Sequence, residues 1–203
     1  MPASLVSHDA AVWSGWSERL RRDDHDALRA VFDHAYAPLV RFAEGLVRDP
    51  GIAADFAQEA FVRLWEHRAS IDPGQSLRAW LFRTVRNLAL NHHRDGRTRE
   101  RLLDDAGIEA TAAVPRPFVA PDAALEAEEL LERVRAGIAS LPPRQREALE
   151  LSRFQGLSHA EIADVMSCAP RTVNNHLVRA LEALRQHLAP VGSFVTTLLG
   201  VLS

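Results

Sequence analysis

Apolar residues recur at helical spacing along almost the whole chain, and this pattern constrains the fold more than any other feature of the sequence. Side chains three or four positions apart lie on one face of an α-helix, whereas a half-buried strand alternates apolar and polar residues. No alternating strand pattern of four residues stands out in the sequence. We therefore predict an all-α protein.

Three amphipathic helices are predicted in the first half of the chain. The first carries an apolar stripe over residues 28–46 and stops before Pro50, because proline disfavours helical geometry in the residue that precedes it. The second covers residues 52–65. Ser76 is a plausible N-cap for the third, which is expected to end at Asp95-Gly96. We expect these three helices to form one unit.

The second half of the chain has a different organisation. Residues 102–124 mix Pro, Ala and acidic residues without a sustained period, which predicts a flexible acidic linker. A further helix follows, and Pro142-Pro143 separates it from the next one. Ser158 and Glu161 have the spacing of a capping box, and Pro170 begins the last long helix, which runs to about residue 188. The chain is thus expected to hold two small helical domains joined by a flexible acidic linker.

These boundaries define five segments. They are an N-terminal extension at 1–24, a helical domain at 25–101, the linker at 102–124, a second helical domain at 125–189 and an apolar tail at 190–203. The tail has apolar residues at helical spacing, and it either packs on the second domain or binds a partner.

Charge is segregated along the chain although the net charge is only −3. Residues 76–101 hold seven arginines and two acidic residues, whereas residues 102–132 hold eight acidic residues and one arginine. The sequence contains no lysine. Arginine suits phosphate and guanine edges, although this usage could equally reflect genomic base composition. The first of these segments is a candidate nucleic-acid surface.

Composition also excludes several classes of protein. The single cysteine, Cys168, excludes an internal disulfide framework and provides no metal-binding cluster. We find no signal peptide and no apolar run of the roughly 20 residues that span a bilayer, so we expect a cytoplasmic protein without membrane insertion. No glycine-rich phosphate loop or nucleophile–base pair is present, so we expect neither an enzyme nor a cofactor.

The segment 156–188 has the length and spacing of a helix-turn-helix. Apolar residues of its first helix can pack on Val173, Leu177, Leu181 and Leu184 of the second. The N-terminal end of the second helix carries outward hydrogen-bonding residues, and this end enters the major groove in the motif. These candidates are Arg171, Thr172, Asn174, Asn175, His176 and Arg179. An ordinary helical hairpin with a solvated polar face is the alternative.

Three segments together resemble a known family. "LPPRQREALELSRFQGLSHAEIADVMSCAPRTVNNHLVRALEALR" resembles region four of bacterial sigma factors, and "DPGIAADFAQEAFVRLWEHR" resembles the polymerase-binding helix of region two. "LRAWLFRTVRNLALNHHRDGRTR" resembles the helix that opens and reads the minus-ten element. The short linker is similar to that of the extracytoplasmic-function (ECF) subgroup.

The resemblance implies roles for particular residues. Region four binds the minus-thirty-five element and the flap of the polymerase beta subunit. Asp55, Gln58 and Glu59 match positions that dock on the coiled coil of the beta-prime clamp, and a solvated helix face is the alternative. The candidates for minus-ten DNA are Arg83, Arg86, Asn87, Asn91, Arg94 and Arg97. Together with the loop at residues 72–76, Asn87 and Asn91 could bind a flipped base.

Two functional classes follow from the sequence. The first is a promoter-specificity subunit that acts with core RNA polymerase on promoter DNA, with an anti-sigma factor as a further partner implied by the resemblance. The second is a free-standing helix-turn-helix regulator. The adjacent pair His92-His93 invites a metal site, but neighbours on a helix diverge by about 100° and no third ligand is evident.

Overall fold

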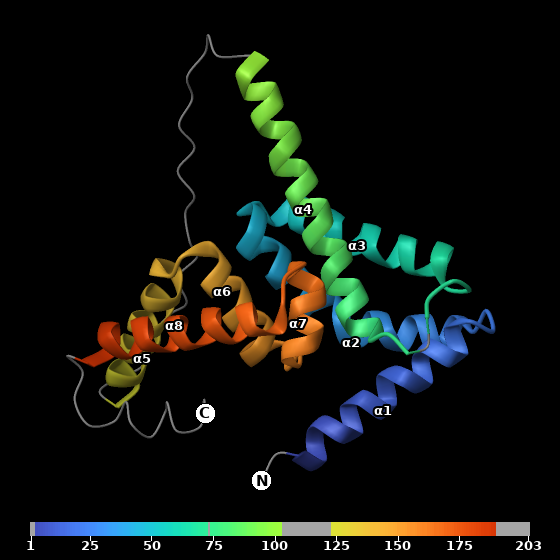
Figure 1. The fold of residues 1–203 in the computed structure, drawn as a ribbon, viewed down its shortest axis with the longest axis horizontal. Helices are drawn as coiled ribbons and strands as arrows, with labels where there is room; N and C mark the ends of the chain where they lie inside the picture. Colours follow the sequence, from blue (N-terminus) through green and yellow to red (C-terminus); the bar gives the residue numbers. More distant parts are fainter. Residues whose placement is uncertain (1–2, 73, 103–122, 190–203) are drawn as a thin grey trace. The chain divides into compact units, whose positions relative to one another are not determined.

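The computed structural model describes residues 3–72, 74–102 and 123–189, and within these ranges every regular element is helical (Figure 1). This confirms the all-α prediction. The chain divides into two compact units, Met1–Ala112 and Ala113–Ser203. Nearly all of the predicted linker and the whole of the apolar tail lie outside the described residues.

The described part of the first unit folds into α1 Ala3–Leu20, α2 His25–Val47, α3 Pro50–His67 and α4 Leu77–Leu102. Its core is built from apolar side chains of α2, α3 and α4, and α3 contributes three alanines besides Phe61 and Leu64. The fully buried members include Val31, Leu39, Ala53, Ala57, Ala60, Leu64, Leu81 and Val85. Alanines at 53, 57 and 60 let α2 and α3 pack closely, and α4 packs on both of them.

Helix α1 was not predicted, because residues 1–24 were expected to form only an extension. It packs on α2 and α4 through Trp13 and Leu20, both almost fully buried. The Trp13 and Trp16 rings contact the His34 ring of α2 with centroid distances of 5.4 and 5.5 Å. The guanidinium of Arg78, at the start of α4, lies 5.8 Å from the Trp13 ring centroid. The first helix is therefore part of the unit.

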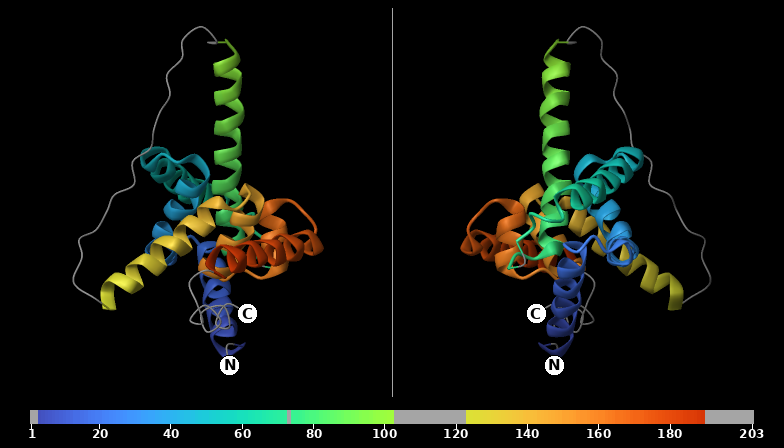
Figure 2. Two further views of the ribbon diagram at one scale, coloured as in Figure 1. Left: turned by 90° about the vertical axis from the view of Figure 1, so that its left-hand side faces the viewer. Right: turned by 90° about the vertical axis from the view of Figure 1, so that its right-hand side faces the viewer.

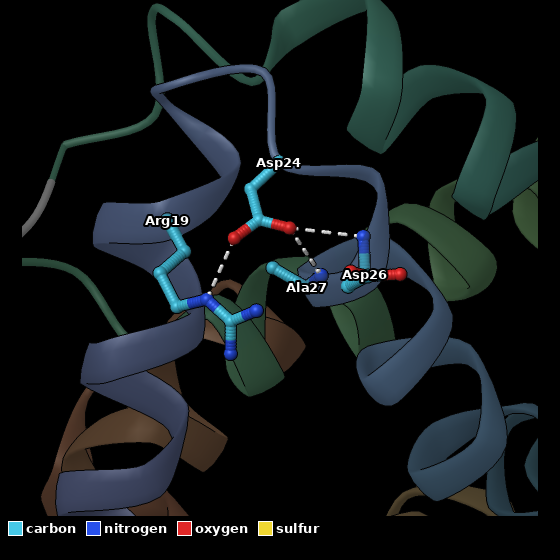
Figure 3. Close-up of polar contacts among 4 residues, drawn as sticks. All are labelled: Arg19, Asp24, Asp26 and Ala27. Atoms are coloured by element: carbon cyan, nitrogen blue, oxygen red, sulfur yellow. Dashed lines mark hydrogen bonds and ion pairs between the residues drawn. The ribbon is translucent and has the colours of Figure 1, made fainter.

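Asp24 fixes the corner between α1 and α2 (Figure 3). Its Oδ1 accepts hydrogen bonds from the backbone N–H groups of Asp26 at 2.9 Å and Ala27 at 3.1 Å, which makes it the N-cap of α2. Its Oδ2 accepts a hydrogen bond from Arg19 Nε at 2.8 Å. The Arg19 bond and the Ala27 N–H hold the pKa of the Asp24 carboxyl below its ordinary value.

The predicted turns on either side of α3 are confirmed. Arg48 adopts a left-handed conformation at the end of α2, and Asp49 Oδ1 caps α3 by accepting from Ile52 N at 3.0 Å. Ser76 Oγ accepts from Ala79 N at 3.2 Å and so caps the start of α4. Before it, Asp72 Oδ1 accepts from Gly74 N at 2.8 Å, which tightens the loop between α3 and α4.

The predicted end of the third helix was wrong. Helix α4 continues through Asp95-Gly96 to Leu102, and its last part extends beyond α2 and α3 in the views of Figures 1 and 2. A single glycine costs a helix only about 1 kcal/mol relative to alanine. The arginine-rich sequence on its C-terminal side favours helix and offsets that cost.

The second unit contains α5 Ala123–Ser140, α6 Pro143–Leu149, the π-helical turn η1 Glu150–Phe154, α7 His159–Met166 and α8 Pro170–Leu188. The predicted breaks at Pro142-Pro143, Gly156 and Pro170 are all confirmed. A cluster of Leu141, Leu149, Ala180 and Leu184 joins α6 and α8. Gly137 of α5 allows close approach, since a Cβ there would lie 2.9 Å from His187 Cδ2 and 3.0 Å from Leu184 Cδ2.

Arg146 of α6 secures the junction with α5. Its guanidinium donates to the carbonyl oxygens of Ile138 at 3.1 Å, Leu141 at 3.0 Å, and Ala139. These carbonyls belong to the last turn of α5 and the residue after it, where intrahelical partners are missing. The side chain therefore caps α5 and holds it against α6.

Candidate nucleic-acid and polymerase interfaces

The helix-turn-helix is formed by α7 and α8. Ser158 Oγ accepts from Glu161 N at 3.3 Å, and Glu161 Oε2 accepts from Ser158 N at 2.8 Å, so the predicted capping box is confirmed. Ser167, with a φ of 52°, ends α7 in a left-handed conformation. The Cys168 N–H donates to the carbonyl of Ala163 at 2.9 Å and closes the turn.

Arg144 of α6 ties this turn to the rest of the unit. Its Nη2 donates to the carbonyl oxygen of Met166, the last residue of α7, at 3.3 Å. Its Nη1 donates at 3.2 Å to Glu147 Oε2, a carboxylate that is almost fully buried. Because both partners are held by one planar guanidinium, α6 fixes the orientation of α7 and of the turn before α8.

The two faces of α8 are clearly separated. The buried stripe consists of Val173, Leu177, Ala180, Leu184 and Leu188. Leu184 was expected to pack on α7, but it belongs to the cluster with Leu141 and Leu149, and Leu181 packs against the same cluster. The C-terminal half of α8 therefore serves to hold α8 on α5 and α6.

The predicted DNA-contacting residues lie on the other face of α8. Five of the six are exposed and His176 is half-buried. No side chain caps the first turn of α8, but Pro170 has no N–H and the Thr172 N–H donates to the carbonyl oxygen of Ala169 at 2.9 Å, so this helix start offers few amides to a phosphate. The exposed set is Arg171, Thr172, Asn174, Asn175 and Arg179. The structure thus brings these candidates together in the N-terminal half of one helix.

The arginine-rich helix α4 exposes fewer of the predicted DNA-contacting residues than expected. Asn87, Asn91 and Arg94 are exposed and Arg83 is half-buried, all at spacings of three or four residues. Arg86 is only 6% exposed, because it lies on the packed side of α4 next to Val85. It is therefore poorly placed for direct contact with DNA, and its prediction as a DNA-contacting residue is not supported. Arg97 lies beyond the side chains that the structure describes.

The parts of the predicted pocket for a flipped base lie too far apart to form one site. The loop that Asp72 tightens lies at the N-terminal end of α4. At about 1.5 Å per residue, Asn87 and Asn91 lie roughly 15 and 21 Å farther along the helix than Leu77. One base cannot reach both places, so the loop and the two asparagines form separate candidate contacts.

The predicted polymerase-binding residues lie on the solvent side of α3. Asp55 and Gln58 are exposed, and Glu59 is half-buried and forms an ion pair with Arg63, Oε1 to Nε, at 2.8 Å. The buried stripe of α3 faces the other way. Among the aromatic residues of α3, Phe61 is buried, whereas Phe56 and Trp65 are half-buried. The Trp65 ring stacks on His25 with a centroid distance of 4.5 Å and lies under the Arg68 guanidinium at 4.1 Å.

Several features were absent from the sequence prediction. The caps made by Arg144 and Arg146 have no signal in a single sequence, because both depend on where other helices end. Helix α1 does have a signal in the sequence, because Trp13, Ser17 and Leu20 share a helical face. Burial raises the pKa of Glu150 in η1 to about 7; the nearby Glu147 carboxylate adds to the effect and Arg146 opposes it.

The His92-His93 pair makes contacts other than metal ligation in the described part of the chain. The His93 ring nitrogen Nε2 is 2.9 Å from the carbonyl oxygen of Leu46, and the His92 ring lies beside Phe56. No group of three or more metal-ligating residues occurs among the described residues. None of the described helices is long and apolar enough to span a bilayer.

The two helical units, one with a helix-turn-helix and the other with an arginine-rich helix, are typical of a DNA-binding protein. The "Sigma-70 region 2" family model matches residues 31–99 and the "Sigma-70, region 4" model matches residues 131–184. The RNA polymerase sigma-H factor of Pseudomonas aeruginosa is 32% identical over 86% of this chain and 92% of its own length.

Two further sigma factors are similar to this chain. The ECF RNA polymerase sigma factor SigL of Mycobacterium tuberculosis is 32% identical over 81% of this chain and 90% of its own length. The solved sigma factor RpoE of Bartonella quintana, in complex with the anti-sigma factor NepR, has a TM-score of 0.58 and 26% identity, covering 79% of this chain and 96% of its own. The chain belongs to the sigma-70 family, within the ECF group. It directs promoter-specific transcription initiation, and the free-standing regulator is not favoured.

Proposed function

We propose that this sigma factor uses three surfaces for three tasks: α3 for core polymerase, α4 for the minus-ten element and α8 for the minus-thirty-five element. The observation that carries the proposal is that each set of exposed polar residues lies opposite the buried stripe of its own helix. Such a helix can present its polar face to a partner while its apolar face stays in the core.

The α3 surface is proposed to bind the beta-prime clamp through Asp55, Gln58 and Glu59. Two of these side chains are exposed, and binding would require Glu59 either to leave Arg63 or to engage the partner jointly with it. We expect the double variant Gln58→Ala, Glu59→Arg to lose binding to core polymerase in a pull-down without loss of helical content. Glu18→Arg, a reversal at an exposed position of α1, is the matched control. Retained binding by the double variant would refute this assignment.

The α4 surface is proposed to hold promoter DNA in the minus-ten region. Arg83 and Arg94 can neutralise phosphates, and Asn87 and Asn91 can form hydrogen bonds to base edges of an opened strand. Strand opening here would be driven by binding energy, so the protein needs no cofactor or catalytic chemistry of its own. Asn87→Ala with Asn91→Ala should reduce open-complex formation on duplex promoters more than on promoters with a preformed bubble.

The α8 surface is proposed to recognise the minus-thirty-five element in the major groove. Arg171 and Arg179 can form forked hydrogen bonds to guanine, and Asn174 or Asn175 can pair with adenine, at about 1–3 kcal/mol of discrimination for each good pair. His176 is half-buried, so less of its side chain is available to a base than of its exposed neighbours. Asn175→Ala should relax preference at one base pair, whereas a loss of affinity for all sequences alike would count against base recognition.

An anti-sigma factor is proposed as the regulating partner, and the cytoplasm as the place of action. Support for the partner comes from the RpoE–NepR complex named above, in which a similar sigma factor is bound by an anti-sigma factor. Support for the compartment comes from the family, whose partners are RNA polymerase and DNA. Affinity capture of the full chain from its native cells, with identification of a protein that blocks transcription in a purified system, tests the partner.

A further inference from the structure

The exposed face of α8 contains one large apolar side chain among polar ones. Val178 is 46% exposed, whereas every other large apolar residue of α8 lies on the buried or half-buried side. Its burial is not needed for the core, since Val173, Leu177 and Leu184 already complete the buried stripe. An exposed β-branched residue also slightly disfavours the helix, so packing and propensity give no reason for valine here.

The helical register places Val178 within the proposed DNA-contacting surface. It follows Asn174 by four residues, Asn175 by three and Arg171 by seven, so all four side chains lie along one face of α8. All four are exposed. Glu182, also exposed and one turn farther on, carries a negative charge that disfavours phosphate, so the row formed by Arg171, Asn174, Asn175 and Val178 ends before an acidic position.

The only apolar group that a base pair presents in the major groove is the C5-methyl of thymine. A valine side chain offers two methyl groups and no hydrogen-bonding atom, so contact with that methyl is the one favourable interaction it can make with a base edge. One turn of helix advances about 5.4 Å and base pairs are stacked about 3.4 Å apart, so its target lies one to two base pairs from the base bound by the asparagines.

We propose that Val178 is a specificity-determining residue that recognises the methyl group of one thymine in the minus-thirty-five element. This inference rests on the proposed role of α8 in binding that element. It adds that part of the recognition is apolar contact, which salt does not screen, at a position where the exposed neighbouring residues are all polar.

The test uses the holoenzyme formed by the full chain with core polymerase. A preferred minus-thirty-five sequence is first selected from promoters randomised in that region. Each thymine is then replaced, one at a time, by deoxyuridine, which removes only the methyl group, and binding is measured by fluorescence anisotropy. We expect one position at which deoxyuridine weakens binding about fourfold, which corresponds to the loss of about 0.8 kcal/mol for one buried methyl group.

The variant Val178→Ala should bind the thymine promoter about fourfold more weakly and should no longer distinguish thymine from deoxyuridine at that position. Alanine favours helix at an exposed site, so the variant is expected to fold. Leu131→Ala, at another exposed apolar position of the same unit, is the control and should keep the full sensitivity.

The outcomes distinguish the role of α8 from the role of Val178. If selection yields no preferred minus-thirty-five sequence, the proposed role of α8 fails and this inference fails with it. If a preferred sequence emerges but no thymine is sensitive to loss of its methyl group, or if Val178→Ala keeps that sensitivity, the role of α8 stands and the assignment of Val178 is overturned.

Discussion

Glu150 should make the second unit less stable as the pH rises toward neutrality. Its carboxyl is half-buried in η1, and burial raises its pKa from the ordinary value of 4.5 to about 7. The folded protein therefore holds this proton more tightly than the unfolded chain does, and the free energy of unfolding falls as the pH increases from about 4.5 to about 7. Above that window the penalty is constant.

The size of the effect follows from the difference between the two pKa values. At about 1.36 kcal/mol per pH unit, the difference between 4.5 and about 7 corresponds to roughly 3.4 kcal/mol. Because the side chain is partly exposed, solvent screening reduces this to about 1–2 kcal/mol. Glutamine has the shape of the protonated carboxyl without its titration, so Glu150→Gln should stabilise the second unit by that amount at pH 8 and by little at pH 4.5.

The chain offers an internal reference for this measurement. All four tryptophans, Trp13, Trp16, Trp65 and Trp80, lie in the first unit, so their fluorescence reports on that unit alone. Urea unfolding followed by circular dichroism and by tryptophan fluorescence at several pH values therefore separates the two units. Glu132→Gln, which removes an exposed carboxylate of α5, is the control. Equal stabilisation by Glu150→Gln at pH 8 and pH 4.5 would refute the reasoning.

Two further predictions concern packing and capping. Gly137→Ala should destabilise the second unit by about 1–3 kcal/mol in thermal unfolding, because the new Cβ would meet the side chains of His187 and Leu184 at 2.9 and 3.0 Å. Gly15→Ala, where nothing lies within 4 Å, should stabilise α1 slightly, and equal effects at the two glycines would contradict this account. Asp24→Ala should lower the urea midpoint of tryptophan fluorescence at pH 7, because it removes the cap and the bond to Arg19. The pKa of Asp24 is lowered below 3.8, so its contribution is lost as the pH falls below that value, and the variant should approach wild type in strong acid; a difference that persists there would count against the charge-based explanation.

Local sequence signals predicted the helix boundaries well wherever a cap or a proline fixes them. Asp49 with Pro50, the Ser158–Glu161 capping box and Pro170 act through bonds within a few residues, so the sequence alone reveals them. The predicted helix end at Asp95-Gly96 was wrong because a single glycine only lowers the helix propensity at its own position. The length of α4 depends on the summed helix propensity of the surrounding residues.

The candidate surfaces were predictable as faces of helices but not in every residue. Arg86 was included because arginine is common in nucleic-acid surfaces, yet its position next to the packed side of α4 buries it. The distance between the Asp72 loop and Asn91 follows from the helix length, which a motif match does not take into account. The caps by Arg144 and Arg146 join residues whose proximity only the fold creates.

This chain gives core RNA polymerase its promoter specificity. Run-off transcription with purified core polymerase, on templates from the genome of origin, tests it most directly. We predict discrete transcripts that require the added protein and that disappear when α3 carries Gln58→Ala and Glu59→Arg. Absence of any promoter-specific transcript with the wild-type protein, on every template and with core polymerase shown to be active, would contradict the claim.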